Sequence, residues 1–282
     1  HHAVLHPCQY LMKNGFDVTI LPVDQSGKIA VSDVEAALRE DTILVSVMYA
    51  NNETGTRQPI AEIGKLLKGT GAAFHTDAVQ AYAVTSIDVN ELGIDLLSVT
   101  AHKMSGPKGS GFLYVRDGVE LSPLFFGGEQ ERKRRAGTEN VAGIIGFKTA
   151  IEVAKEKQRE KIETYKRLRQ RLLEQFEESG IDYVVNGDVD ECLPHILNVS
   201  FPGTTAEALL VNLDLAGISA SSGSACTAGS LEPSHVLTAM FPHDKKRAES
   251  AIRFSFGLGN TVQEIEKAGM ETLKAVERMT GR

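Results

Sequence analysis

One lysine in the sequence is placed where its amine could act as a nucleophile. Lys103 follows an apolar run and precedes the glycine- and proline-containing turn Gly106 to Gly109. Partial burial at a strand end would lower the pKa of its ammonium group and free the amine to attack a carbonyl, as in Schiff-base enzymes. Thr100 and His102 lie beside it and supply donors that suit a phosphate group. The alternative is a solvated lysine in a tight turn, since lysine is usually exposed.

A carboxylate occupies a comparable position earlier in the chain. Asp77 ends the apolar run that starts at Ala72, and Gln80 follows three residues later. Pyridoxal phosphate (PLP) needs an acidic partner for its pyridinium nitrogen, so that the ring can act as an electron sink. Asp77 could be that partner, and Gln80 could donate to the phenolic oxygen. Alone, Asp77 is more simply a helix N-cap, but a strand-end Asp followed by a strand-end Lys favours a PLP site.

A single thiol lies in a segment of small residues. Cys226 is at the centre of Ser221 to Ser230, which is rich in Gly, Ser and Ala and predicts a mobile exposed loop. A thiol in such a loop is more often reactive than structural, the alternative being an incidental surface cysteine. Cys8 and Cys192 lie in ordinary contexts and are predicted to be inert. Three widely spaced cysteines fit neither a disulfide framework nor a zinc site, so no metal is expected and a reducing, cytoplasmic location is predicted.

An arginine lies within the apolar strand pattern Ser250 to Phe256. A guanidinium group in such a position is unfavourable unless it meets a carboxylate or a phosphate. Arg253 therefore has two possible partners. An internal Asp or Glu would make it a structural ion pair, whereas an amino-acid substrate would supply its own carboxylate.

The elements that would position these residues alternate in the first half of the chain. The continuous β-branched run Thr42 to Ala50 predicts a strand covered on both faces. A helix is expected over Pro59 to Lys68, and further strands at Ala72 to Asp77, Asp95 to Thr100 and Gly111 to Val115. This alternation predicts βαβ units and a mostly parallel sheet. Ligands of such sheets gather at the carboxyl ends of the strands, where the polar groups named above would lie.

The second half of the chain has a different pattern of apolar and charged residues. Asn140 to Glu178 predicts a long amphipathic helix or a helix pair with a solvated charged face. Beyond it, strands and helices mix in a pattern typical of a smaller α+β domain. The expected strands are Ile196 to Phe201 and Ala251 to Phe256, and the expected helices are Thr205 to Leu213 and Thr261 to Met279. We place the domain boundary in the helical stretch, which gives domains 1–158 and 159–282.

Composition excludes several classes of protein. The chain has 282 residues, of which 42% are hydrophobic and 24% charged, as in ordinary globular proteins. Its formal net charge of −7 argues against nucleic acid or an anionic membrane as the main partner. No apolar run approaches the roughly 20 residues needed to cross a bilayer.

The motifs together resemble those of the cysteine desulfurases in the class V aminotransferase group, the NifS/IscS-like family. The resemblance covers almost the whole chain and rests on six motifs in the family's order. They are N-N-E-x-G at Asn51 to Gly55, H-x-D-A-x-Q at His75 to Gln80, H-K-x-x-G-P-K-G at His102 to Gly109, R-x-G-T-E-N at Arg135 to Asn140, S-S-G-S-A-C-T at Ser221 to Thr227 and I-R-F-S at Ile252 to Ser255. One such motif can occur by chance, but six in order indicate a shared family.

The resemblance implies five residues that hold the cofactor. Lys103 would bind PLP covalently. Asp77 would pair with the pyridinium nitrogen, and Gln80 would contact the phenolic oxygen. Thr100 and His102 would bind the phosphate. The family usually has serine at the first of these two positions, and threonine keeps its hydroxyl group.

The resemblance implies a further set of residues around the substrate. His1 matches the histidine that stacks on the ring and moves protons. Asn52 would lie near the cofactor and the substrate carboxylate, which Arg253 would clamp. Cys226 would accept the substrate sulfur as a persulfide. Thr138 would reach the phosphate bound by the other subunit of a homodimer.

As a whole, the resemblance implies an α/β protein of the PLP-dependent transferase fold type I. Its large domain would have a mostly parallel sheet, and its smaller α+β C-terminal domain would carry the cysteine loop. The enzyme would convert L-cysteine to L-alanine and pass sulfur to acceptor proteins, either an iron-sulfur scaffold or tRNA-thiolation enzymes. The alternatives are a selenocysteine lyase, another class V PLP enzyme, or an inactive sulfur-trafficking scaffold.

Family members begin well upstream of the residue that matches His1. That upstream segment supplies a glycine-rich turn whose helix N-terminus holds the phosphate. We therefore expect this sequence to lack the family's N-terminal segment, and we attribute the full activity to a longer parent protein.

Overall fold

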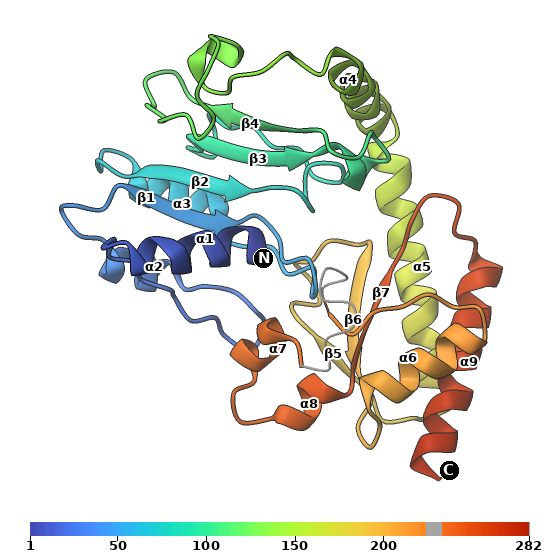
Figure 1. Ribbon diagram of the computed structural model, residues 1–282. Helices are drawn as coiled ribbons and strands as arrows, with labels where there is room; N and C mark the ends of the chain where they lie inside the picture. The colour runs from blue at the N-terminus through green and yellow to red at the C-terminus, as the bar shows by residue number, and fades with distance from the viewer. Residues whose placement is uncertain (224–232, 282) are drawn as a thin grey trace. The chain divides into compact units, whose positions relative to one another are not determined.

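The computed structural model describes residues 1–223 and 233–281, which form two compact units (Figure 1). The sheet unit comprises Leu38–Tyr49 and Ile60–Arg159, and the second unit comprises His1–Ala37, Ala50–Pro59 and Glu160–Arg282. One border between the two units falls between Arg159 and Glu160. Residues 1–37 and 50–59 group with the C-terminal half by contact, so these units do not coincide with domains 1–158 and 159–282. For the whole protein, domains 1–158 and 159–282 stay a proposal.

The sheet unit is built on four strands in the order β1-β2-β3-β4. They are β1 (Leu44–Met48), β2 (Ala73–Asp77), β3 (Leu96–Thr100) and β4 (Gly111–Val115). β2 pairs in parallel with β1 and with β3, whereas β4 is antiparallel to β3. The four predicted strands therefore occur where the sequence indicates them, in a mostly parallel sheet.

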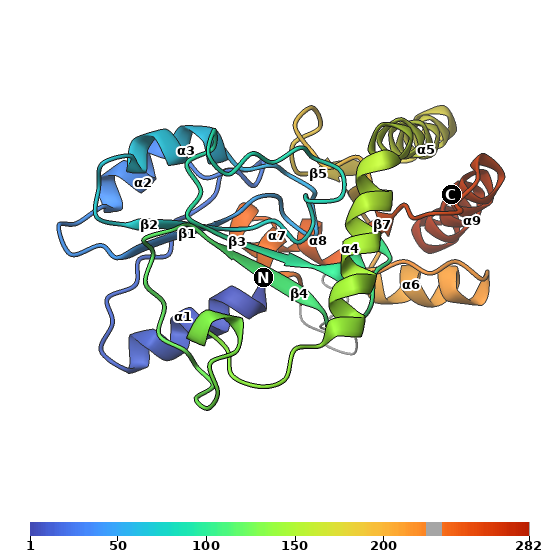
Figure 2. The ribbon, with the colours of Figure 1, turned by 90° about the horizontal axis from the view of Figure 1, so that it is seen from above.

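Helices and turns complete the sheet unit. Figure 2 shows α3 (Ile60–Leu67) along one face of the sheet, with its apolar side buried. Gly64 is required in this helix, because a Cβ there would meet the carbonyl oxygen of Leu92 at 1.9 Å. The remaining elements are η1 (Ala101–Met104), η2 (Glu131–Lys133) and α4 (Val141–Glu156). β1 is not covered on both faces as predicted: Leu44 is 49% exposed, because this edge strand has one face that no element of its unit covers.

The second unit has a three-stranded antiparallel sheet in the order β5-β6-β7. Its strands are β5 (Val184–Asn186), β6 (Ile196–Ser200) and β7 (Ala251–Ser255), and β6 is buried along its whole length. The longer helices α5 (Gln158–Ser179), α6 (Ala206–Leu215) and α9 (Val262–Thr280) gather beside this sheet (Figure 1). Their apolar faces form the core with Phe176 and Phe201, which meet edge to face at 5.4 Å.

Shorter helices complete the second unit. They are α1 (His2–Lys13), α2 (Val31–Ala37), α7 (His235–Met240) and α8 (Lys245–Glu249). The N-terminus of α9 is closed by a capping box, which Thr261 and Glu264 form. Within the part of the chain that the structure describes, no helix is both long enough and apolar enough to span a bilayer.

Candidate active site

The strand pairing brings two predicted groups to one edge of the four-stranded sheet. β2 and β3 are parallel, and Asp77 at the end of β2 lies opposite Ser98 of β3. Thr100 ends β3, and η1 with Lys103 follows directly. The carboxyl ends of adjacent parallel strands are where α/β sheets bind ligands. The sheet therefore supplies the edge that the sequence predicts for a cofactor.

Asp77 is half-buried and accepts one hydrogen bond from the chain that follows it. The Val79 N–H donates to Oδ1 at 3.0 Å. The carboxylate thus caps a turn rather than a helix, since residues 79–84 form turns. Within the described residues no donor reaches Oδ2, which leaves an acceptor for a cationic nitrogen. Gln80 is half-buried in the same turn.

His75 is a site residue that the residue-type analysis missed. On β2 its ring joins three strands: Nδ1 lies 2.7 Å from Ser46 Oγ of β1, and Nε2 lies 2.9 Å from Ser98 Oγ of β3. Burial lowers its pKa, although the charge of Asp77 opposes the shift. The imidazole lies between two hydroxyls and links the three strands beside Asp77. Its place two residues before Asp77, on the same strand face, was the available signal.

Thr100 and His102 form a polar pair at the end of β3. Thr100 Oγ1 lies 2.9 Å from His102 Nδ1 and 3.3 Å from the carbonyl oxygen of Ser110. The pKa of His102 is lowered, first by burial and then by the positive charges of Lys103 and Lys108. A hydroxyl and an imidazole beside two ammonium groups suit a bound phosphate.

Lys103 is exposed, so the predicted partial burial of this lysine is wrong for the described chain. The reason is the geometry of η1: Ala101 and Met104 are its buried positions, which turn the intervening side chains outward. Ser105 closes the turn in the left-handed region with φ of 64°. Gly106 packs closely beneath it, since a Cβ there would lie 3.0 Å from the Cβ of Ala150 in α4. The amine is accessible on a tightly held turn.

These residues fit PLP by their chemistry. An available carboxylate oxygen suits a pyridinium nitrogen, a hydroxyl-imidazole pair beside two lysines suits a phosphate, and an accessible primary amine suits a carbonyl carbon. All of them lie at or just beyond the carboxyl ends of β2 and β3.

The N-N-E-x-G motif forms a turn in the second unit. Asn51 Oδ1 accepts hydrogen bonds from the backbone N–H groups of Glu53 and Thr54, at 2.8 and 3.1 Å. Gly55 has φ of +79° and packs against Leu193, so only glycine fits easily at that point. Asn52 is 7% exposed within this turn.

Arg253 lies on β7, opposite Asn198 of β6, and it meets the turn just described. Its Nη1 donates to the carbonyl oxygen of Asn52 at 3.0 Å. The structure thus brings together the two residues predicted to bind a substrate carboxylate. Arg253 also has an internal carboxylate near it. This is Glu53, whose charged form is favoured by the positive charge of Arg253.

Glu53 is the second residue that the sequence analysis missed, since the motif was read only for its asparagines. It is 1% exposed, and burial raises its pKa. A hydrogen bond from Ser234 and the charge of Arg253 oppose that shift. No pattern in the sequence connects Glu53 with Ser234, which is far along the chain.

We expect Glu53→Gln to change the pH dependence of stability. Since the pKa of Glu53 is raised from 4.5 in the folded protein, its contribution is fully present below the unfolded value. That contribution is lost as the pH rises through the folded value. Glutamine cannot ionise, so the variant should gain stability relative to the unmodified protein as the pH rises above 4.5, the ordinary value for glutamate. Melting temperatures measured across this range test the effect, and a constant difference would contradict it.

Three predicted site residues remain: His1, Thr138 and Cys226. His1 is exposed and caps α1, with Nδ1 accepting from the Ala3 N–H at 3.1 Å, so its other nitrogen carries the proton. Thr138 is exposed in the segment before α4. Cys226 lies outside the described residues.

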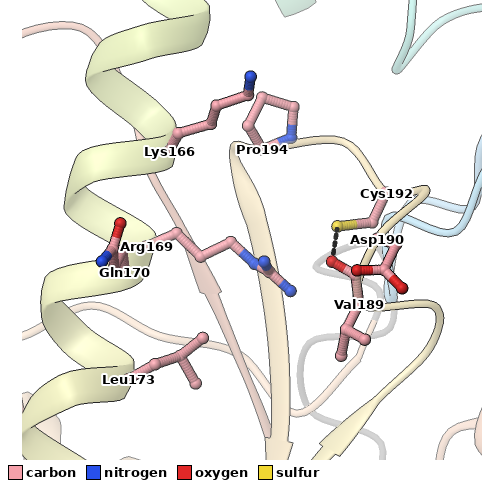
Figure 3. Close-up of a pocket in the computed structure, with 8 residues that line it drawn as sticks. All are labelled: Lys166, Arg169, Gln170, Leu173, Val189, Asp190, Cys192 and Pro194. Carbon is pink, nitrogen blue, oxygen red and sulfur yellow. Dashed lines mark hydrogen bonds between the residues drawn. The ribbon is translucent and has the colours of Figure 1, made fainter.

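The pocket in Figure 3 contains none of the predicted site residues. It has a volume of about 410 Å³ and lies between α5 and the segment before β6. Its thiol, Cys192, points to the carbonyl oxygen of Val189 at 3.7 Å, and burial raises its pKa. A raised pKa keeps a thiol protonated and unreactive. The inert role expected for Cys192 stays a prediction.

Comparison with known proteins identifies the family. Residues 1–268 match the family described as Aminotransferase class-V. The chain is 57% identical over 280 residues to the putative cysteine desulfurase IscS 1 of Bacillus subtilis (strain 168), covering 99% of this chain and 74% of that protein. It is 47% identical over 280 residues to the cysteine desulfurase IscS of Dictyoglomus turgidum (strain DSM 6724 / Z-1310), covering 99% and 70%. A solved NifS-like protein matches with a TM-score of 0.88 and 36% identity, over 97% of this chain and 72% of that chain.

The chain therefore belongs to the class-V aminotransferase family. Its fold is the α/β fold of PLP-dependent transferases of fold type I, as predicted. Within this family it is similar to proteins named cysteine desulfurase, and members of the family depend on PLP. The chain spans 70 and 74% of the length of the two relatives given above.

Proposed function

We propose that the protein is a PLP-dependent cysteine desulfurase that releases L-alanine and transfers sulfur to its own thiol. The observation that carries the proposal is the polar edge of the four-stranded sheet, where Asp77, Thr100 and Lys103 follow two paired parallel strands. The contact between Arg253 and Asn52 adds a place for an amino-acid carboxylate. The names of the relatives supply the substrate class.

The residues at the sheet edge would hold the cofactor. Bound PLP would supply an electron sink for the α-carbon of the substrate. Asp77 would pair with the pyridinium nitrogen and Gln80 with the phenolic oxygen, while Thr100 and His102 would bind the phosphate. The amine of Lys103 would hold the carbonyl carbon, give up its place to the substrate and then move a proton at the α-carbon.

The residues of the second unit would bind the substrate and accept the sulfur. Arg253 and Asn52 would orient the substrate carboxylate, and His1 would stack on the ring. The Cys226 thiolate would form an S–S bond as the C–S bond of cysteine breaks. The electron pair of that bond stays with carbon, which takes a proton and becomes the methyl group of alanine.

The sulfur acceptors, the oligomeric state and the domain roles belong to the same proposal. The S-S-G-S-A-C-T motif resembles that of desulfurases serving iron-sulfur cluster assembly and tRNA thiolation, so the acceptors would be scaffold or thiolation proteins in the cytoplasm. A homodimer is supported by apolar side chains exposed before Thr138, among them Leu124 (89%) and Phe126 (85%). Thr138 would reach the phosphate bound by the partner. Domains 1–158 and 159–282 would hold the cofactor and the thiol.

Alanine formation tests the proposed function. The PLP-loaded protein should convert L-cysteine to alanine, with one sulfide released per alanine in the presence of a reducing thiol. A protein that binds PLP and consumes only selenocysteine would contradict the proposal in favour of a lyase. A protein that makes no alanine from either amino acid would point to the inactive scaffold.

Arg253→Lys should raise the KM for cysteine at least several-fold. The paired charge-assisted bonds of a guanidinium to a carboxylate cannot be reproduced by an ammonium, and a hydrogen bond to a charged group is worth roughly 1.5–3 kcal/mol. The measurement is a cysteine titration alongside a thermal melt. An unchanged KM with a lowered melting temperature would show that Arg253 serves Glu53 and Asn52 instead of the substrate.

A further inference from the structure

Both flanks of the segment that carries Cys226 meet at one buried carboxylate. On the C-terminal side, Ser234 Oγ donates to Glu53 Oε2 at 2.5 Å. On the N-terminal side, Gly223 is buried against the same oxygen: a Cβ at Gly223 would lie 3.1 Å from Oε2. One residue on each side of 224–232, Gly223 and Ser234, therefore lies beside the carboxyl group of Glu53, and Ser234 is hydrogen-bonded to it.

Glu53 itself is held from several directions. Its backbone N–H donates to Asn51 Oδ1 at 2.8 Å, and its carbonyl oxygen accepts from Asn198 Nδ2 at 3.3 Å. Asn198 is fully buried at the centre of β6. The backbone of Glu53 is thus fixed to the Asn51 turn and to the three-stranded sheet, so its side chain starts from a fixed point beside both flanks.

Each flank is also joined to a regular element. Ser221 pairs with Arg253 of β7 through two backbone hydrogen bonds, of 3.2 and 2.6 Å, and its Oγ donates to the carbonyl oxygen of Gly223 at 2.8 Å. Ser234 caps α7, where its Oγ accepts from the Leu237 N–H at 3.2 Å. The Ser234 hydroxyl therefore donates to the carboxylate of Glu53 and accepts from the first turn of α7. Glu53 lies where these two anchors meet.

We propose that Glu53 is a positioning residue: its Oε2 atom fixes Ser234 by a hydrogen bond beside the buried Gly223, and so keeps the two described flanks next to each other. The inference rests on the proposed function, because it concerns delivery of the Cys226 thiol. A chain segment with both ends fixed gives its central residues a smaller accessible volume than a segment with one free end. Confinement raises the fraction of time that a reacting group spends in attack geometry.

The test compares Glu53→Ala, Ser234→Ala and Glu53→Gln in the PLP-loaded protein, with Ser222→Ala as a matched control. Ser222 is exposed between the two anchored positions of the first flank. Glu53→Ala and Ser234→Ala remove the bond and should slow persulfide formation by about tenfold, within the up to ~10²-fold cost of a 1 Å misplacement. Glutamine can still accept from Ser234, so Glu53→Gln should stay near the unmodified rate. The PLP absorbance should not change in any variant, and the KM for cysteine should not change in Ser234→Ala or Ser222→Ala. Glu53→Ala also removes the carboxylate beside Arg253, so Ser234→Ala is the variant that separates positioning from substrate binding.

Hydrogen exchange supplies a readout that does not need activity. In Glu53→Ala and Ser234→Ala, amides in peptides covering 218–223 and 233–238 should exchange faster, while those of β6 should not. Wild-type persulfide rates and wild-type exchange in both variants would overturn the inference. A uniform loss of cofactor and substrate binding would also overturn it, because Glu53 would then only stabilise the fold. If the unmodified protein makes no persulfide, the proposed function fails, and the exchange data alone decide whether Glu53 holds the flanks.

Discussion

Lys103→Ala should abolish alanine production and leave no pyridoxyl group on the chain after borohydride reduction. The structure shows an accessible amine on a tight turn that follows β3, next to Thr100 and His102. Alanine retains the helical turn but removes the amine, so the fold should persist while the covalent link is lost. The variant should keep its melting temperature without cofactor, and added primary amines should restore part of the activity.

Lys108 provides the matched control, because it is an exposed lysine of the same motif. Lys108→Ala should retain the pyridoxyl group and most of the activity. Its positive charge contributes to the lowered pKa of His102, so PLP should bind somewhat more weakly. A pyridoxyl group on Lys108, or one that survives in Lys103→Ala, would contradict the assignment.

Cys226→Ala should retain the yellow cofactor and bind cysteine, yet release no sulfide above the background rate. The thiolate is the atom that would accept sulfur, and no other described thiol is suited to replace it. Cys192 has a pKa raised by burial, and Cys8 lies on α1. The measurement is sulfide release under single-turnover conditions, together with the visible spectrum.

Cys192→Ala and Cys8→Ala serve as controls for the thiol. Both should desulfurate cysteine at close to the unmodified rate. Normal sulfide release by Cys226→Ala would show that the persulfide step is wrong. Loss of activity in Cys192→Ala would move the accepting thiol to the pocket between α5 and β6.

Local patterns were sufficient to predict most of the fold. The continuous apolar runs predicted β1 to β4, because β-branched residues between turn signals are typical of buried strands. The helix expected over Thr261 to Met279 was found as α9, and the structure shows a capping box at its start. Shorter helices such as α7 and α8 were missed, because helices of this length show less than two turns of any pattern.

The candidate site could be predicted only where its residues belong to local motifs. Asp77 and Lys103 were found because each ends or follows a strand. His75 and Glu53 were missed, because their roles depend on Ser98 in a neighbouring strand and on Ser234, 181 residues along the chain. The exposure of Lys103 was also missed, since it depends on which positions of η1 pack inward.

The identity of the sulfur-bearing atom tests the central claim most directly. The PLP-loaded protein is mixed with one equivalent of L-cysteine, quenched with an alkylating agent and analysed by peptide mass spectrometry, while alanine is measured in the same sample. The account predicts one additional sulfur atom on Cys226, in an amount equal to the alanine formed, with none on Cys8 or Cys192. Alanine formed without sulfur on Cys226, or sulfur found on another cysteine, would contradict it.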